Sequence, residues 1–131
     1  MKYMLLMSAT KDVFEWFSKW PKEDLQKNMA FMRNFNKELK DEGVLVATGG
    51  LAWPNQAVIV RAASDGTPIT DGVFPESKEF LAGYWLIDVE NADEAYKIAA
   101  RVSLAPAPAG TEGTMPVEVR EVMGSAPEDL M

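Results

Sequence analysis

The chain has 131 residues, 47% hydrophobic and 25% charged, a composition that predicts one globular domain over residues 1–123 and a flexible acidic tail over 124–131. Cysteine and histidine are absent, which excludes disulfides, thiolate nucleophiles, histidine bases and zinc sites built on either residue. A hard cation such as magnesium or calcium needs only oxygen ligands and is not excluded, but no tight acidic cluster of calcium-loop type is visible, so we expect no metal and no cofactor. The net charge of −7 opposes nucleic-acid binding, and no signal peptide or membrane span is predicted, so we expect a cytoplasmic protein.

The first third of the chain predicts one strand and two helices. Residues 2–8 form a short apolar run of β type, and Asp12 is the expected N-cap of the short helix that follows. One face of this helix carries Val13, Trp16, Phe17 and Trp20. That face either seals the core edge or a subunit contact, or it covers a ligand. A longer helix is predicted from Pro21 to Gly43, a glycine suited to the position just past a helix end.

The middle of the chain predicts strands and a hairpin. Residues 44–48 form a predicted strand that weakens at Gly49-Gly50, where missing side chains let a backbone or a ligand come close. Residues 57–62 and 67–70 predict a hairpin, because Asp65-Gly66 between them supplies the tight turn that a hairpin needs.

The last three predicted elements decide the fold class. Residues 83–89 predict a strand that is apolar on both faces, Asn91 is the expected cap of a helix over 92–102, and a strand over 117–123 follows. This order puts both main helices on one face of a mostly antiparallel sheet, an α+β, ferredoxin-like sandwich. Because strand 83–89 is apolar on its other face too, we expect a second copy to cover that face in a two-fold homodimer.

Two segments carry a resemblance to a known family. One runs from Met1 to Leu6, and the other from Thr70 to Glu79 with Asp71-Gly72-Val73-Phe74 within it. They resemble the YCII-related family, specifically its DGPF branch, with Val73 where the family name has Pro. The resemblance covers residues 1–122 and implies a dimeric α+β barrel. Members of the wider family are suspected of small-molecule chemistry around a His-Asp pair, which a chain without histidine cannot use.

The candidate site centres on Asp71. An apolar pocket would raise the pKa of such a carboxylate and suit it to take a proton from a small organic acid or phenol. The candidate ligand-binding residues are Arg61, Phe74, Glu76, Lys78, Tyr84 and Trp85. Alternatively, Asp71 bonds the amides of its own turn and Gly72 supplies a positive φ, so that the run is scaffold.

Three functions fit these features. The first is a dimeric protein that binds a small molecule without a catalytic centre. The second is a cofactor-independent enzyme that acts on a small organic substrate with Asp71 as general base. The third is a structural or regulatory protein-interaction module, linked to transcription because DGPF relatives often accompany sigma factors of the extracytoplasmic type.

Overall fold

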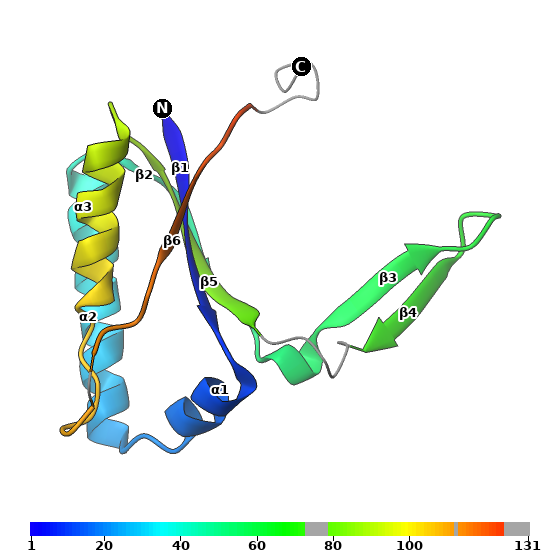
Figure 1. Ribbon diagram of the computed structural model, residues 1–131, viewed down its shortest axis with the longest axis horizontal. Helices are drawn as coiled ribbons and strands as arrows, with labels where there is room; N and C mark the ends of the chain where they lie inside the picture. Colours follow the sequence, from blue (N-terminus) through cyan, green and yellow to red (C-terminus); the bar gives the residue numbers. More distant parts are fainter. Residues whose placement is uncertain (73–78, 112, 125–131) are drawn as a thin grey trace.

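A computed structural model describes residues 1–72, 79–111 and 113–124 (Figure 1). These residues form three α-helices and two antiparallel sheets, which confirms the predicted α+β class. In chain order the elements are β1 (Lys2–Ala9), α1 (Lys11–Ser18), α2 (Lys22–Asp41), β2 (Leu45–Gly50), the short 3-10 helix η1 (Pro54–Gln56), β3 (Val58–Ala62), β4 (Pro68–Gly72), β5 (Phe80–Asp88), α3 (Ala92–Ser103) and β6 (Glu118–Glu121).

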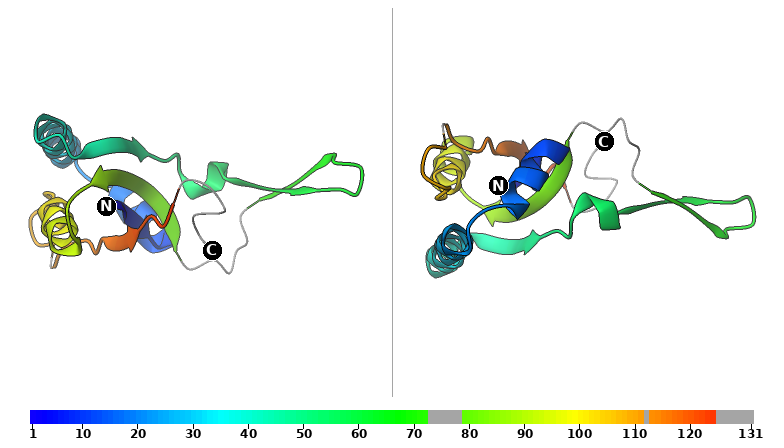
Figure 2. Two further views of the ribbon diagram at one scale, coloured as in Figure 1. Left: turned by 90° about the horizontal axis from the view of Figure 1, so that it is seen from above. Right: turned by 90° about the horizontal axis from the view of Figure 1, so that it is seen from below.

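The main sheet has four antiparallel strands in the order β2-β5-β1-β6. Strands β1 and β5 are central, and their register places Leu5 opposite Trp85. Helices α2 and α3 lie side by side against one face of this sheet, and no α-helix lies on its other face in the part of the chain that the structure describes (Figures 1 and 2). The sequence therefore predicted correctly that both long helices cover the same face.

The hydrophobic core lies between these two helices and the sheet. Each element contributes a fully buried side chain, because alternation in the strands and helical spacing in α2 and α3 turn one apolar set inward. The four largest side chains with almost no exposure are Leu5, Leu39, Ile87 and Val102.

The helix ends agree with the sequence predictions at two sites and correct them at a third. Asn91 caps α3 by accepting a hydrogen bond from the Glu94 amide at 3.0 Å, and Gly43 ends α2 with a φ of 76°. The cap of α1 is Thr10, however, and not Asp12. Thr10 has an extended backbone and its hydroxyl accepts from the Val13 amide at 3.3 Å, so Asp12 falls inside the first turn.

Strands β3 and β4 form a separate two-stranded sheet, the predicted hairpin, which we call the arm (residues 58–72). The arm projects from the helix-covered body in every view (Figures 1 and 2). Its turn contains Gly66 at a φ of 88°, and the Asp65 carboxylate accepts from the Thr67 amide at 2.9 Å. Hydrogen bonding to Thr67 lowers the pKa of the Asp65 carboxyl.

Strands β4 and β6 differ in extent from the sequence prediction. Strand β4 continues through Asp71 to Gly72, and Gly72 pairs with Val58 without a positive φ. The alternative in which Asp71 bonds its own turn and Gly72 has a positive φ is therefore wrong, because cross-strand pairing with β3 holds both residues extended. The last strand is also shorter than predicted and spans only Glu118–Glu121, where it pairs with β1.

Among the described residues, no helix combines the length and apolar character needed to cross a membrane.

The core predicts a large difference between two leucine-sized positions on α2. Leu39 is fully buried, whereas Met29 on the same helix is 57% exposed. We expect Leu39→Ala to lower the free energy of unfolding by about 2 to 5 kcal/mol, because it leaves a cavity. The matched variant Met29→Ala should change it by less than about 0.5 kcal/mol. Urea unfolding followed by circular dichroism measures both, and equal effects would contradict this packing.

Candidate functional site

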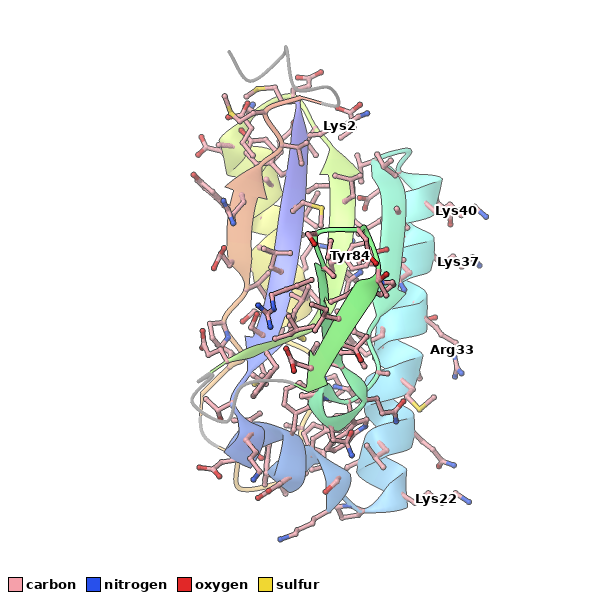
Figure 3. All side chains as sticks on the ribbon, turned by 90° about the vertical axis from the view of Figure 1, so that its right-hand side faces the viewer. Lys2, Lys22, Arg33, Lys37, Lys40 and Tyr84 are labelled. Carbon is pink, nitrogen blue, oxygen red and sulfur yellow. The ribbon has the colours of Figure 1, made fainter. Side chains whose placement is uncertain are left out.

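The candidate site is the face of the main sheet that the helices leave uncovered. Its side chains alternate with those of the core: Leu6 and Tyr84 face each other across β1 and β5, beside the core pair Leu5 and Trp85. We define the open sheet face by six residues of the three strands β1, β2 and β5: Met4, Leu6, Ala47, Gly49, Tyr84 and Leu86. Figure 3 looks onto this face and labels Tyr84.

The Tyr84 ring lies close to Gly49 of the neighbouring strand β2. A Cβ built on Gly49 would come within 3.2 Å of the Tyr84 ring, so a larger residue at that position would displace the ring. The backbone carbonyl of Tyr84 accepts a hydrogen bond from the Thr48 hydroxyl at 2.9 Å. The Gly49-Gly50 pair predicted the close approach of a backbone or a ligand, whereas at Gly49 the ring of Tyr84 comes close instead and places a phenol on an otherwise apolar surface.

Strand β6 adds charged groups at one edge of the open sheet face. Glu118 and Arg120 lie in register with Leu6 and Met4, so their side chains leave the sheet on the same side. Their charged atoms are 3.8 Å apart and both side chains are well exposed. A cation and a carboxylate therefore border an apolar surface with one phenol in it.

Trp85 points the other way, into the core. It is buried, its indole N–H donates to the Asn36 side-chain oxygen at 2.7 Å, and its ring meets Phe35 edge-on at 5.8 Å. Consecutive strand residues face opposite sides of a sheet, so Tyr84 and Trp85 do not share a site. Here Trp85 fixes the packing between α2 and the sheet.

Asp71 and Arg61 lie together on the arm. The Arg61 guanidinium is 3.4 Å from the Asp71 carboxylate, and both side chains are about half exposed or more. They belong to a different sheet from Tyr84 and Trp85, so the structure joins two of the predicted site residues with each other and separates them from the aromatic ones. Phe74, Glu76 and Lys78 lie outside the described residues.

An aromatic cluster at the base of the arm was not predicted. The Phe14 ring contacts Trp53 at 5.6 Å and Phe80 at 6.5 Å, which ties α1 to the segments that enter and leave the arm. We call Phe14, Trp53 and Phe80 the base cluster. Helical spacing had selected the neighbouring face of α1, where Trp16 and Phe17 instead pack on Trp20 with ring separations of 5.0 and 4.7 Å.

An open hollow of about 370 Å³ lies between α2 and α3, on the far side of the sheet from the open face. Arg101 occupies its wall, bonded to Glu38 at 2.9 Å and Glu42 at 3.3 Å, with its guanidinium over the Phe35 ring. Burial lowers the pKa of Arg101, but the hydrogen bonds to Glu42 and Glu38 outweigh it and raise the pKa overall. These charges already satisfy one another, so the cluster joins the two helices.

Four basic residues line the outer side of α2. Arg33, Lys37 and Lys40 follow helical spacing, and Figure 3 shows them pointing away from the sheet, as Lys22 does. The described residues provide them with no ion-pair partner. These four basic side chains form a solvated helix face on an acidic protein, which we call the basic stripe.

No group of three or more Asp or Glu side chains arranged to hold a metal ion occurs within the described ranges.

Together the fold and the open face define a class: an α+β protein whose antiparallel sheet has helices on one face and an uncovered apolar surface on the other. The YCII-related domain matches residues 1–125, and the chain belongs to this family. It is also 30% identical over 100 residues to an uncharacterised protein of Rhizobium meliloti (strain 1021). That match covers 76% of this chain and 81% of the relative.

The geometry of the arm predicts a weak coupling between Arg61 and Asp71. An exposed ion pair gains little in water, so we expect a double-mutant cycle with Arg61→Ala and Asp71→Ala to give a coupling below about 1 kcal/mol. The coupling should also shrink as salt is added. Urea unfolding of the four proteins measures it, and a coupling that persisted in 1 M salt would contradict an exposed pair.

Proposed function

We propose that this protein is a homodimer that binds a small organic molecule at the open sheet face. The observation that carries the proposal is the composition of that face, in which Met4, Leu6 and Leu86 surround a single phenol, Tyr84. These side chains are half-buried in the single chain, and a partner or a ligand on this face would remove their remaining apolar surface from water. If two copies face each other at the open sheet face, the same surface forms the subunit contact and the ligand site.

The topology supports a finer assignment of the fold. The strand order β2-β5-β1-β6, with two helices on one face, is the order of a ferredoxin-like sandwich that has the arm inserted between its second and third strands. We propose that two such sheets face each other as a dimeric α+β barrel. We also place the chain in the DGPF branch, on the residues from Thr70 to Glu79, of which 73–78 lie outside the described ranges.

The chemistry of the open sheet face indicates the class of ligand. Its centre is apolar, its one central polar group is the Tyr84 hydroxyl, and Arg120 stands at the β6 edge. Such a surface suits a small, largely apolar or aromatic molecule that carries an acidic or hydrogen-bonding group. A phenol can donate to or accept from that group, and the guanidinium can pair with it if it is an anion.

The other two functions lack a comparable observation. As a general base, Asp71 would need an apolar surrounding and a substrate within reach, whereas its carboxylate is exposed and paired with Arg61 on the arm. No described contact favours a transcription-linked module either. The ligand-binding dimer is therefore the function that the described residues support best.

The proposed dimer predicts that one charge on the open sheet face separates the subunits. We expect Leu6→Lys to produce a monomer, because a buried ammonium at the centre of the contact is too costly to desolvate. The matched variant is Leu104→Lys, at a 69% exposed position on the helix side, which should leave the dimer intact. Sedimentation equilibrium measures the mass, and circular dichroism checks the fold. A folded Leu6→Lys dimer would contradict the proposal.

The proposed ligand site predicts a role for one hydroxyl group. Anilinonaphthalene sulfonate is aromatic and anionic, and we expect the dimer to bind it with a rise in fluorescence. Tyr84→Phe should weaken this binding about five- to tenfold, the effect of losing one hydrogen bond of roughly 1 kcal/mol. Tyr96→Phe, at an exposed position on α3, is the control. Equal binding by both variants and the unmodified chain would rule out Tyr84 as the polar contact.

A further inference from the structure

We propose that the arm of each subunit reaches across to a second copy of the chain and packs its uncharged face against it. This inference rests on the proposed homodimer and assigns the arm a place in it. The arm would then clasp the partner, and the subunit contact would consist of the open sheet face and two arms related by the two-fold axis.

The two faces of the arm differ in chemistry. The register pairs Val58 with Gly72, Val60 with Thr70 and Ala62 with Pro68, and residues that pair directly lie on the same face. We call these six residues the neutral arm face. The opposite face carries Ile59, Arg61, Ile69 and Asp71, including the ion pair. Covering the charged face would desolvate that pair, whereas covering the neutral arm face costs no charge burial.

The arm is not a self-sufficient unit. It has two strands of five residues each, and a lone two-stranded hairpin is at best marginally stable in water. Val58 and Val60 are both 59% exposed on the neutral arm face. The outer edges of β3 and β4 pair with no other described strand. A hairpin with this much exposed apolar surface gains stability when another surface covers it.

The direction of the arm selects a second copy as that surface. Helices α2 and α3 lie on one side of the main sheet, and the arm leaves on the other side, where the sheet is open (Figures 1 and 3). The arm therefore leads away from its own body. A copy placed on the open sheet face stands on the side toward which the arm extends, so the contact with the sheet and the contact with the arm are continuous.

The length of the arm is sufficient to reach a second copy placed on the open sheet face. Five antiparallel residues span about 17 Å, whereas two sheets packed face to face lie about 10 Å apart. An arm of this length reaches past the first layer of the partner and can lie along it. Each copy carries a net charge of −7, so a contact between copies favours uncharged surfaces, which the neutral arm face provides.

The base cluster joins α1 to residues on either side of the arm. Phe14 contacts both Trp53, before the arm, and Phe80, after it. These contacts hold the two ends of the insertion against α1 of its own subunit. The arm thus starts from a packed support, which lowers the entropy lost when it docks.

Single cysteines test the clasp directly, because the chain contains no other thiol. Val60→Cys places the thiol on the neutral arm face, and Ile69→Cys places it on the charged face of the same hairpin. The rate of alkylation by iodoacetamide is measured for each variant across a range of protein concentrations that spans dissociation of the dimer. The same two variants are repeated in the Leu6→Lys background, and circular dichroism checks the fold of all four.

We expect the Val60→Cys thiol to react at least tenfold more slowly in the dimer than after dilution, and the Ile69→Cys thiol to change less than twofold. In the Leu6→Lys background both thiols should react at the fast rate. A dimer in which Val60→Cys stays fast at every concentration would overturn the clasp and leave the sheet contact standing. A chain that is monomeric throughout would overturn the proposed homodimer itself.

Discussion

A four-stranded sheet with two apolar faces and helices for only one of them is the constraint on which this structure depends. Leu5, Trp85 and Ile87 on the inner face are buried under α2 and α3. Leu6 and Tyr84 alternate with them and face the other way. Because strand geometry sends neighbouring side chains to opposite faces, the sequence that builds the core also builds the open sheet face. The function that we propose follows from this surplus of apolar surface.

The arm adds further apolar surface that no other part of the described chain covers. Its insertion between β2 and β5 adds strands that contribute nothing to the main sheet and expose Val58 and Val60. The arm and the half-buried open sheet face lie on one side of the main sheet, while the basic stripe and the Arg101 cluster lie on the helix side. We propose a second copy of the chain as the partner because it would cover both the arm and the open sheet face, and its proposed place beside Tyr84 would turn an open surface into an enclosed site.

The sequence predicted what depends on local pattern and left open what depends on distant contacts. Alternation along residues 83–89 and helical spacing after Pro21 predicted the two-faced strand and the helix that covers it. Asp12 and Thr10 are both good caps, and only the backbone geometry distinguishes them. The Asp65-Gly66 turn predicted the hairpin, but the contacts of Phe14 with Trp53 and Phe80 join residues far apart in the chain, which no local pattern reveals.

The candidate site likewise depends on geometry that the local sequence pattern did not predict. Tyr84 and Trp85 are neighbours in the chain and were grouped together, yet strand geometry separates them by the thickness of the sheet.

The mass of the unmodified chain in solution tests the proposed homodimer most directly. Sedimentation equilibrium at micromolar concentration should give twice the chain mass of 14.5 kDa. A protein that remains at 14.5 kDa up to millimolar concentration would contradict the claim that a second copy covers the open sheet face.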